Sequence, residues 1–571
     1  MLTIDKLSAE LLAEIFEPIH DTSRHTIFSL LRVNKYISDA ALPFVYRELF
    51  FDFDQRRSLN PGEESFKRTL QKVDSLLELP PESAVWKGVR TITVRSRSVT
   101  WPGENPNARW SRNSNEPPFT PSEEAVQDRW SSFIKFLSRV INLRKIVFDC
   151  AERVPIVLLK LLEDKHPSCG LYVRNWTRLR SDARFGDTYE EALARSPCLR
   201  SIEACFVHGG PLMDFNSAAF NRILALSPNL EQFALTSRAA GGCVIYGFTN
   251  EEMVEIEKER ERFRVAQPLR KGSVKRIKWG TLFSGLLQRW EGFINLRNVE
   301  TLELGALYEP EVMEYATDNG VFGGLKHLSF EVARLSPDEG SRERVKSSLG
   351  NFLSSLPHLE SLSIINYHGY IDLPLILSHS GKLLRSLCLH QMENSTGSRP
   401  TLTRHDMEFI RSDAPHLESL EIDLNRTIDP ENHESQIYGI VASFPNLRDL
   451  VLHYDLGIHS KYFQRRHDTE ASDRDFYRKV YTKPDKDFAM GIWRAISKGD
   501  RLEKMTLYIG EPDREMGFGY PVTWVLAEQE YRQQIYVSRN ERDDLKDDVA
   551  ALQIVHRGGG ADLLPYDLDD L

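Results

Sequence analysis

Cysteine is scarce in this sequence: six cysteines are spread over 571 residues, and no two of them stand in a C-x-x-C spacing. A disulfide framework or a zinc knuckle needs closely spaced cysteines, so the sequence predicts neither. We therefore expect a reducing compartment, cytoplasmic, nuclear or both, in which thiols stay free.

Long apolar runs are missing as well. Nowhere do the roughly 18 consecutive apolar residues of a membrane-spanning helix occur. The opening residues MLTIDKLSAELLAEIFEPIH also lack the basic segment and uninterrupted apolar core of a secretory signal. We expect no membrane partner.

An excess of basic residues is absent: Lys and Arg total 73 against 83 Asp and Glu, for a formal net charge of −10. Nucleic-acid binding depends on Lys and Arg that neutralise phosphates, so we expect no nucleic-acid partner. Much of the acidic excess lies in residues 541–571, which carry nine acids and three bases. This composition predicts a disordered acidic tail that folding does not require.

Catalytic signatures are absent too. The sequence contains no H-E-x-x-H, no G-x-S-x-G, no Walker loop and no G-x-G-x-x-G after a predicted strand. We therefore expect a protein that is not an enzyme and that binds no cofactor.

The first fifty residues predict a small helical module. Apolar residues recur at spacings of three and four from Leu7 to Ile19, with acidic residues between them, which is typical of an amphipathic helix. Ser8 is placed to cap its N-terminus. A second apolar stretch follows from residue 26, and Leu42-Pro43 is expected to break its last helix. Two or three helices in so short a segment form too small a core to stand alone.

This segment resembles an F-box. The resemblance covers residues 5–49 and rests on LSAELLAEIF and on SLLRVNKYISDAALPFVYREL, whose closing A-L-P-x-x-Y-R-x-L is similar to fungal versions. An F-box docks onto a Skp-family adaptor and, through it, onto a cullin–RING ubiquitin ligase. Carried over by position, the implied adaptor-binding residues are Leu7, Leu11, Leu12, Ile15, Phe16, Leu30, Val33, Leu42 and Pro43. The sequence departs from the family at Ser8, usually proline, and at Ile37, usually aromatic. The alternative is a helical cap on whatever follows.

A repeat runs through the rest of the chain. The pattern L-x-x-L-x-L, with apolar replacements, occurs eleven times between Val89 and Leu502, and helical segments such as FNRILALSPNL precede most units. Each unit reads as a helix, a tight turn and a short strand that must stack on its neighbours. This resembles a leucine-rich-repeat solenoid, in which parallel strands line a concave face and helices cover the convex one.

The expected fold class is therefore α/β, with an N-terminal three-helix F-box followed by this solenoid. We place the helical module at 1–52, the solenoid at 53–540 with loop insertions at about 101–124, 241–272 and 457–486, and the tail at 541–571.

The repeat also predicts a binding surface. Side chains alternate along a strand, so the polar positions between the apolar ones face the concave side. Acids and hydroxyls at these positions favour a basic or hydroxyl-rich partner. The candidate substrate-binding residues are Glu303, Glu331, Ser361, Ser363, His390, Glu421, Asp423, Asp449 and His453. Because His390, Asp423 and His453 fall on successive strands, they can form a metal site or a hydrogen-bonded polar ladder; the ladder is favoured, and we expect no metal.

Two functions follow from these patterns. The favoured one is the substrate-recognition subunit of an SCF-type cullin–RING ubiquitin ligase, which would tether a protein target that the sequence does not name. The alternative is a leucine-rich-repeat scaffold that binds a partner outside the ubiquitin pathway and carries a vestigial F-box.

Overall fold

The structure is a computed structural model of the 571-residue chain. It describes residues 7–53, 61–96, 123–150, 153–176, 188–208, 212–239, 271–281, 284–307, 309–332, 339–392, 399–425, 433–455, 486–497, 501–509, 533–539 and 549–556. Most of the predicted insertions at 101–124, 241–272 and 457–486 lie outside these residues.

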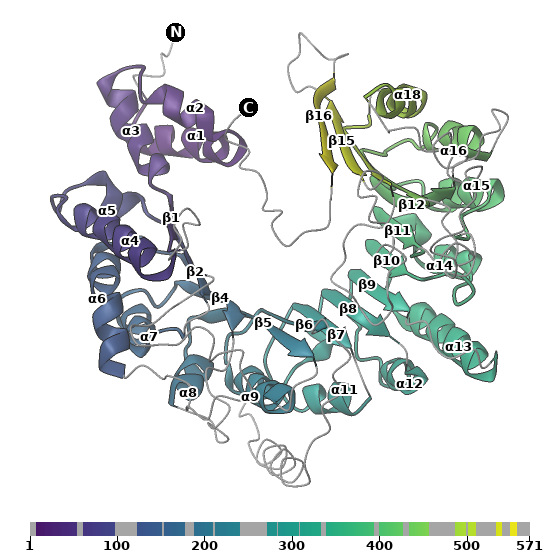
Figure 1. Ribbon diagram of the computed structural model, residues 1–571, viewed down its shortest axis with the longest axis horizontal. Helices are drawn as coiled ribbons and strands as arrows, with labels where there is room; N and C mark the ends of the chain where they lie inside the picture. Colours follow the sequence, from purple (N-terminus) through teal and green to yellow (C-terminus); the bar gives the residue numbers. More distant parts are fainter. Residues whose placement is uncertain are drawn as a thin grey trace, which may run out of the picture. The chain divides into compact units, whose positions relative to one another are not determined.

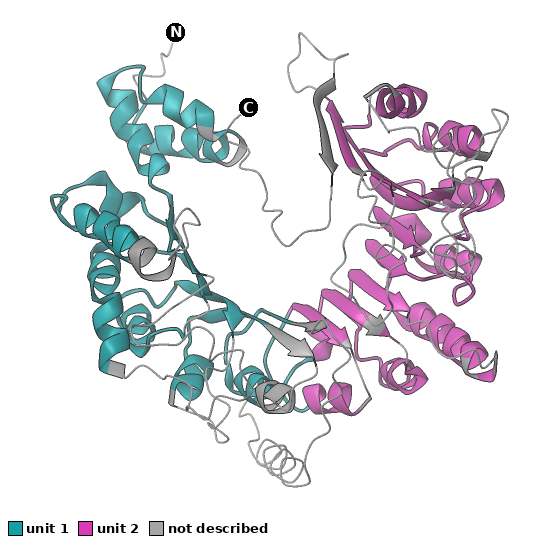
Figure 2. Ribbon diagram, in the orientation of Figure 1, with its two compact units in different colours: residues 1–274, 292–295 teal, residues 275–291, 296–571 magenta. Residues whose placement is uncertain are grey.

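The chain forms two compact units (Figure 2). Unit 1 contains residues 1–274 and 292–295, and unit 2 contains residues 275–291 and 296–571. The sequence predicted one solenoid over 53–540, whereas the structure divides this stretch near residue 274.

Unit 1 begins with three helices and continues as alternating strands and helices. Its elements are α1 (Ala9–Thr22), α2 (Arg24–Leu30), α3 (Lys35–Val45), β1 (Glu48–Asp52), α4 (Pro61–Leu77), α5 (Ala84–Gly88), β2 (Thr91–Ser96), α6 (Glu123–Arg139), β3 (Lys145–Cys150), α7 (Ile156–Lys165), β4 (Gly170–Trp176), α8 (Thr188–Arg195), β5 (Leu199–His208), α9 (Leu212–Leu226) and β6 (Gln232–Ala239). Strands β1 to β6 pair in parallel in chain order. Aromatic side chains such as Trp130, Phe133 and Phe148 fill the core between sheet and helices.

Unit 2 repeats the same plan. Its elements are β7 (Arg276–Thr281), α11 (Ser284–Glu291), η2 (Leu296–Asn298), β8 (Thr301–Leu307), α12 (Pro310–Asn319), β9 (His327–Val332), α13 (Glu339–Ser355), β10 (Ser361–Ile365), α14 (Leu373–Ser380), η3 (Gly381–Leu383), β11 (Ser386–His390), α15 (Arg404–Asp413), β12 (Ser419–Asn425), α16 (His433–Val441), β13 (Asp449–Asp455), α18 (Lys486–Ile496), β14 (Lys504–Ile509), β15 (Gln533–Arg539) and β16 (Val549–His556). Strands β7 to β14 pair in parallel, and the helices lie along one face of the sheet (Figure 1). We call the other face the open face.

The predicted α/β architecture is therefore observed, with long parallel sheets and helices in solenoid order. All eleven L-x-x-L-x-L segments become strands. Burial alternates along them as expected: in β9 Leu328, Phe330 and Val332 are buried, while His327 and Ser329 are half-buried on the open face. Two further strands, β4 and β7, fill the longest gaps between the segments.

The last two strands depart from the parallel pattern. Strand β15 pairs antiparallel with β14, and β16 pairs antiparallel with β15. Residues Val549–His556 thus form a strand inside the segment that composition alone predicted to be a disordered tail. Strand β16 satisfies backbone groups at the edge of β15 that would otherwise be unpaired, and its residues VAALQIVH include no acid, which explains why this part of the acidic segment forms a strand.

The N-terminal helices differ from expectation in two details. Helix α3 continues through Pro43 but ends two residues later at Val45, and the neighbouring Ala41 and Phe44 are buried. Strand β1 pairs with β2 over its full length, so it belongs to the sheet, although the predicted module extended to residue 52.

Candidate functional site

Helices α1 to α3 enclose a core of their own. Its most buried side chains are Leu12, Phe16, Ile27, Ile37, Ala41 and Phe44. The hydroxyl of Ser8 accepts a hydrogen bond from the N–H of Leu11, so the predicted N-cap of α1 is confirmed. Leu12 and Phe16 were predicted to contact an adaptor; because both are fully buried, they stabilise the module instead of forming its surface.

Large apolar side chains of the module lie outside this core. The exposed fraction is 47% for Leu11, 38% for Ile15, 51% for Phe28, 59% for Val33 and 42% for Tyr36. We call these five residues the exposed apolar set. The sequence prediction included three of them and missed Phe28 and Tyr36, although Phe28 directly follows a core position in the helical pattern. Exposed apolar side chains concentrated on so small a module are typical of a protein-binding surface.

The other predicted adaptor residues have mixed surroundings. Leu7 and Leu30 are half-buried and pack against the module's core. The hydroxyl of Tyr36 donates a hydrogen bond of 2.6 Å to the carbonyl oxygen of Leu7, which fixes the start of α1 beside α3. Leu42 is half-buried. These contacts make Leu7 and Leu30 partly structural.

The backbone of Pro43 lies against Gly88, the last residue of α5. A Cβ atom on Gly88 would lie 2.6 Å from the carbonyl oxygen of Pro43 and 2.9 Å from its Cα, so the backbones of α3 and α5 touch. Only glycine permits this approach. Pro43 is therefore an attachment point of the module to the first repeats.

A charged contact strengthens this attachment. The carboxylate of Glu17 in α1 lies 2.7 Å from the guanidinium of Arg47 and 3.1 Å from that of Arg90. These cations hold the pKa of Glu17 below its ordinary value. The two arginines flank β1 and β2, so the helical module is attached to the sheet directly.

The open face of unit 2 is built from aligned rows of side chains. One row contains Ser361, Ser386, Ser419, Asp449 and Lys504, which pair in register across five neighbouring strands. The next row runs through Ser363, Cys388 and Glu421. The parallel register thus places the predicted substrate-binding residues side by side, as the repeat required.

Four of those residues form a buried polar cluster. Nδ1 of His390 donates to Oδ1 of Asp423 at 2.7 Å, and Nε2 of His453 donates to Oε1 of Glu421 at 2.8 Å. The two imidazole rings lie 4.1 Å apart between centroids. The guanidinium of Arg399 lies 3.3 Å from Asp423 and donates to the carbonyl oxygen of His453 at 3.0 Å. The predicted ladder is therefore present in part: His390 bonds to Asp423 as expected, whereas His453 bonds to Glu421, and Arg399 is a member that no repeat position indicated.

Burial corrects the role predicted for three members of this cluster. His390 and Asp423 are 0% exposed and His453 is 2% exposed. These three side chains are therefore buried and not available to a partner. Glu421 is 27% exposed and keeps one edge at the surface.

Burial also sets the protonation of the cluster. It lowers the pKa of His453, although the hydrogen bond to Glu421 acts in the opposite direction. Burial by itself raises the pKa of Glu421, but the hydrogen bond and the charges of His453 and His390 lower it below its ordinary value. Both pKa shifts agree with a neutral His453 that donates its N–H to an ionised Glu421.

The remaining open-face acids are mostly paired. Glu303 lies 3.5 Å from Lys278, and Asp449 lies 3.8 Å from Lys504. Glu331 accepts a hydrogen bond of 3.0 Å from Asn366. Lys278 lies on β7, a strand that the repeat pattern did not predict. The expected charge of the open face therefore did not include this lysine. Since cations already face these acids, the open face attracts a basic partner less than the sequence suggested.

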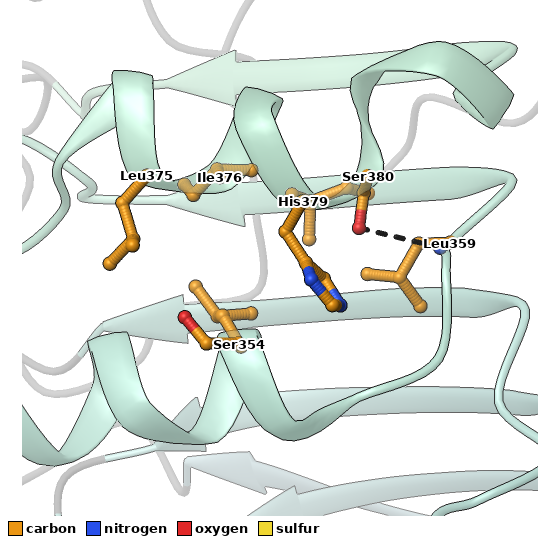
Figure 3. A pocket seen from close by; sticks show the side chains of 8 residues that line it. Ser354, Leu359, Leu375, Ile376, His379 and Ser380 are labelled. Carbon is orange, nitrogen blue, oxygen red and sulfur yellow. Dashed lines mark hydrogen bonds between the residues drawn. The ribbon is translucent and has the colours of Figure 1, made fainter.

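A further candidate site in unit 2 is a small cavity. This cavity of about 10 Å³ between α13, α14 and β10 is lined mainly by leucines, with His379 and Ser380 at one side (Figure 3). It has room for one water molecule at most. The described residues include no group of three or more His, Cys, Asp or Glu side chains placed to bind a metal ion, and none of the described helices is long and apolar enough to cross a membrane.

Fold and surfaces together define an α/β repeat protein with an N-terminal helical module. No family profile matches the sequence, and a comparison with curated proteins finds no match. A chain from the crystal structure of the Rad7 and Elc1 complex in yeast is similar over 79% of this chain and 94% of its own length, with 12% identity and a TM-score of 0.32. A likeness this distant supports no argument about function.

Proposed function

We propose that this chain is the non-catalytic substrate-recognition subunit of an SCF-type cullin–RING ubiquitin ligase. In this proposal helices α1 to α3 bind a Skp-family adaptor, and the open face of unit 2 holds the protein target. The chain acts in the cytoplasm, the nucleus or both. Its contribution to ubiquitin transfer is proximity, since the reacting groups belong to other subunits.

The exposed apolar set carries the proposal. The core of the module is complete without Leu11, Ile15 and Val33, yet these side chains remain in contact with water. They coincide with positions through which an F-box is expected to bind its adaptor. Their exposure in a folded module is explained by a partner that buries them.

The attachment of the module supports a receptor rather than a loosely tethered domain. Glu17 bonds to Arg47 and Arg90, and Gly88 lets α5 touch α3. These contacts fix the adaptor-binding helices to the first repeats of unit 1.

A co-purification experiment with the full chain tests the proposal. We expect the unchanged protein to retain a purified Skp-family adaptor and Val33→Asp to lose it, because a carboxylate would be buried without a partner. Ile141→Asp is the matched control: Ile141 is also 59% exposed but lies between α6 and β3, outside the module. If the unchanged chain does not retain the adaptor, the scaffold function replaces the receptor function.

A further inference from the structure

The histidine pair of the open face has an unusual environment. The rings of His390 and His453 lie 4.1 Å apart between centroids, and both side chains are almost fully buried. His453 also stacks on Tyr508, with an interplanar angle of 11° and centroids 4.8 Å apart. The pair therefore joins β11, β13 and β14 across the open face.

Each ring donates one N–H to a carboxylate of β12, the strand between them. His390 donates to Asp423, and His453 donates to Glu421. Nδ1 of His453 is buried and has no hydrogen-bond partner within the described part of the chain. An additional proton on His453 would therefore sit at a desolvated nitrogen without an acceptor.

Several titratable and charged groups surround the pair. Within the described part of the chain they are Cys388, Glu421, Asp423, Tyr508, Arg399 and, beyond Asp423, Tyr367 and Glu331. Burial raises the pKa of Cys388 and of Tyr367, so both stay neutral. Among the nearest of these groups, Glu421 and Asp423 are acidic and the guanidinium of Arg399 is cationic.

We propose that His390 and His453 form a proton-sensitive latch, which holds β11 to β14 together while the pair carries at most one proton and opens when both rings are protonated. Two imidazolium ions at this separation repel each other strongly where little water screens them. Opening exposes both rings to water and releases the stack on Tyr508. It also frees both carboxylates: the open face then presents Asp423, which the closed state buries, and the whole of Glu421, of which the closed state leaves one edge exposed. The inference does not depend on the proposed function.

Hydrogen exchange on the full chain between pH 7.5 and 5 tests the latch. After correction for the intrinsic pH dependence of amide exchange, opening that takes up one extra proton becomes about tenfold more frequent per pH unit between the second pKa of the open pair and the lower second pKa of the closed pair. We expect this increase in segments 386–392, 419–424, 449–454 and 504–509. Strands β2 to β4 of unit 1 serve as the internal reference and should not show it.

Two isosteric variants separate the latch from general acid sensitivity. His453→Gln keeps an N–H donor near Glu421, and His390→Asn keeps one near Asp423, but neither amide takes up a proton. Each should remain protected at pH 5, whereas His416→Gln, at an exposed histidine, should behave like the unchanged chain. The proposal is overturned if the unchanged chain shows no excess opening, if the variants open as it does, or if both variants are already unprotected at pH 7.5.

Discussion

Truncating Leu11 and Ile15 to alanine should weaken adaptor binding without unfolding the module. The two side chains lie one turn apart on α1 and are 47% and 38% exposed. Neither belongs to the buried core, so their removal leaves no cavity. Alanine also has a higher helix propensity than leucine or isoleucine, so α1 itself is not weakened.

The magnitude follows from the exposed fractions. Complete burial of a leucine or isoleucine side chain contributes about 1.5–3 kcal/mol, and only the part still exposed is available to a partner. For Leu11 and Ile15 together this gives about 1.3–2.5 kcal/mol, or roughly a 10- to 70-fold rise in Kd. Leu12, between them in sequence, is 0% exposed, so Leu12→Ala should instead lower the free energy of unfolding by about 2–5 kcal/mol.

Isothermal titration of a purified Skp-family adaptor into the full chain measures this effect. Circular dichroism melting of each variant reports the fold, and Glu14→Ala, at an exposed polar position of the same helix, is the matched control. Affinity of the double variant within twofold of the unchanged chain would refute the reasoning. So would a loss of helical signal in the double variant equal to that of Leu12→Ala, since both residues would then belong to the core.

Three further outcomes follow from the geometry. Gly88→Ala should lower the free energy of unfolding by about 1–3 kcal/mol in urea, because its Cβ would overlap the backbone of Pro43, and an unchanged midpoint would contradict that contact. Acid should destabilise unit 2. Because the pKa of His453 is lower in the folded chain, the unfolded chain binds a proton at this histidine at a higher pH than the folded chain does. The free energy of unfolding is therefore highest above about pH 6.5 and falls below it. The lowered pKa of Glu421 adds a further loss below about pH 4.5, and urea midpoints that stay constant from pH 7.5 to 4 would exclude both effects. Burial raises the pKa of Cys169 to about 12, so a thiol reagent at neutral pH should modify it only after unfolding, and rapid labelling of Cys169 itself in the native chain, located by peptide mapping, would contradict its burial.

Local patterns in the sequence determined the repeating elements. Alternation with period two depends only on neighbouring residues, and for that reason each L-x-x-L-x-L segment became a strand with the predicted side inward. The N-cap at Ser8 is equally local, since its hydroxyl reaches only the first turn of α1. The row that brings His390, Asp423 and His453 together followed from the repeat as well, because parallel strands in register align equivalent positions.

Contacts between residues far apart in the chain decided the rest. The apolar pattern of α1 does not distinguish Leu11 from Leu12; only the packing of α2 and α3 buries one and leaves the other exposed. Arg399 reaches His453 across 54 positions, and Glu17 reaches Arg90 across 73, and no periodicity links such pairs. The sequence determined which residues face each side of a strand, whereas burial and pairing depend on the chain segments that pack there, and only the tertiary structure brings those segments together.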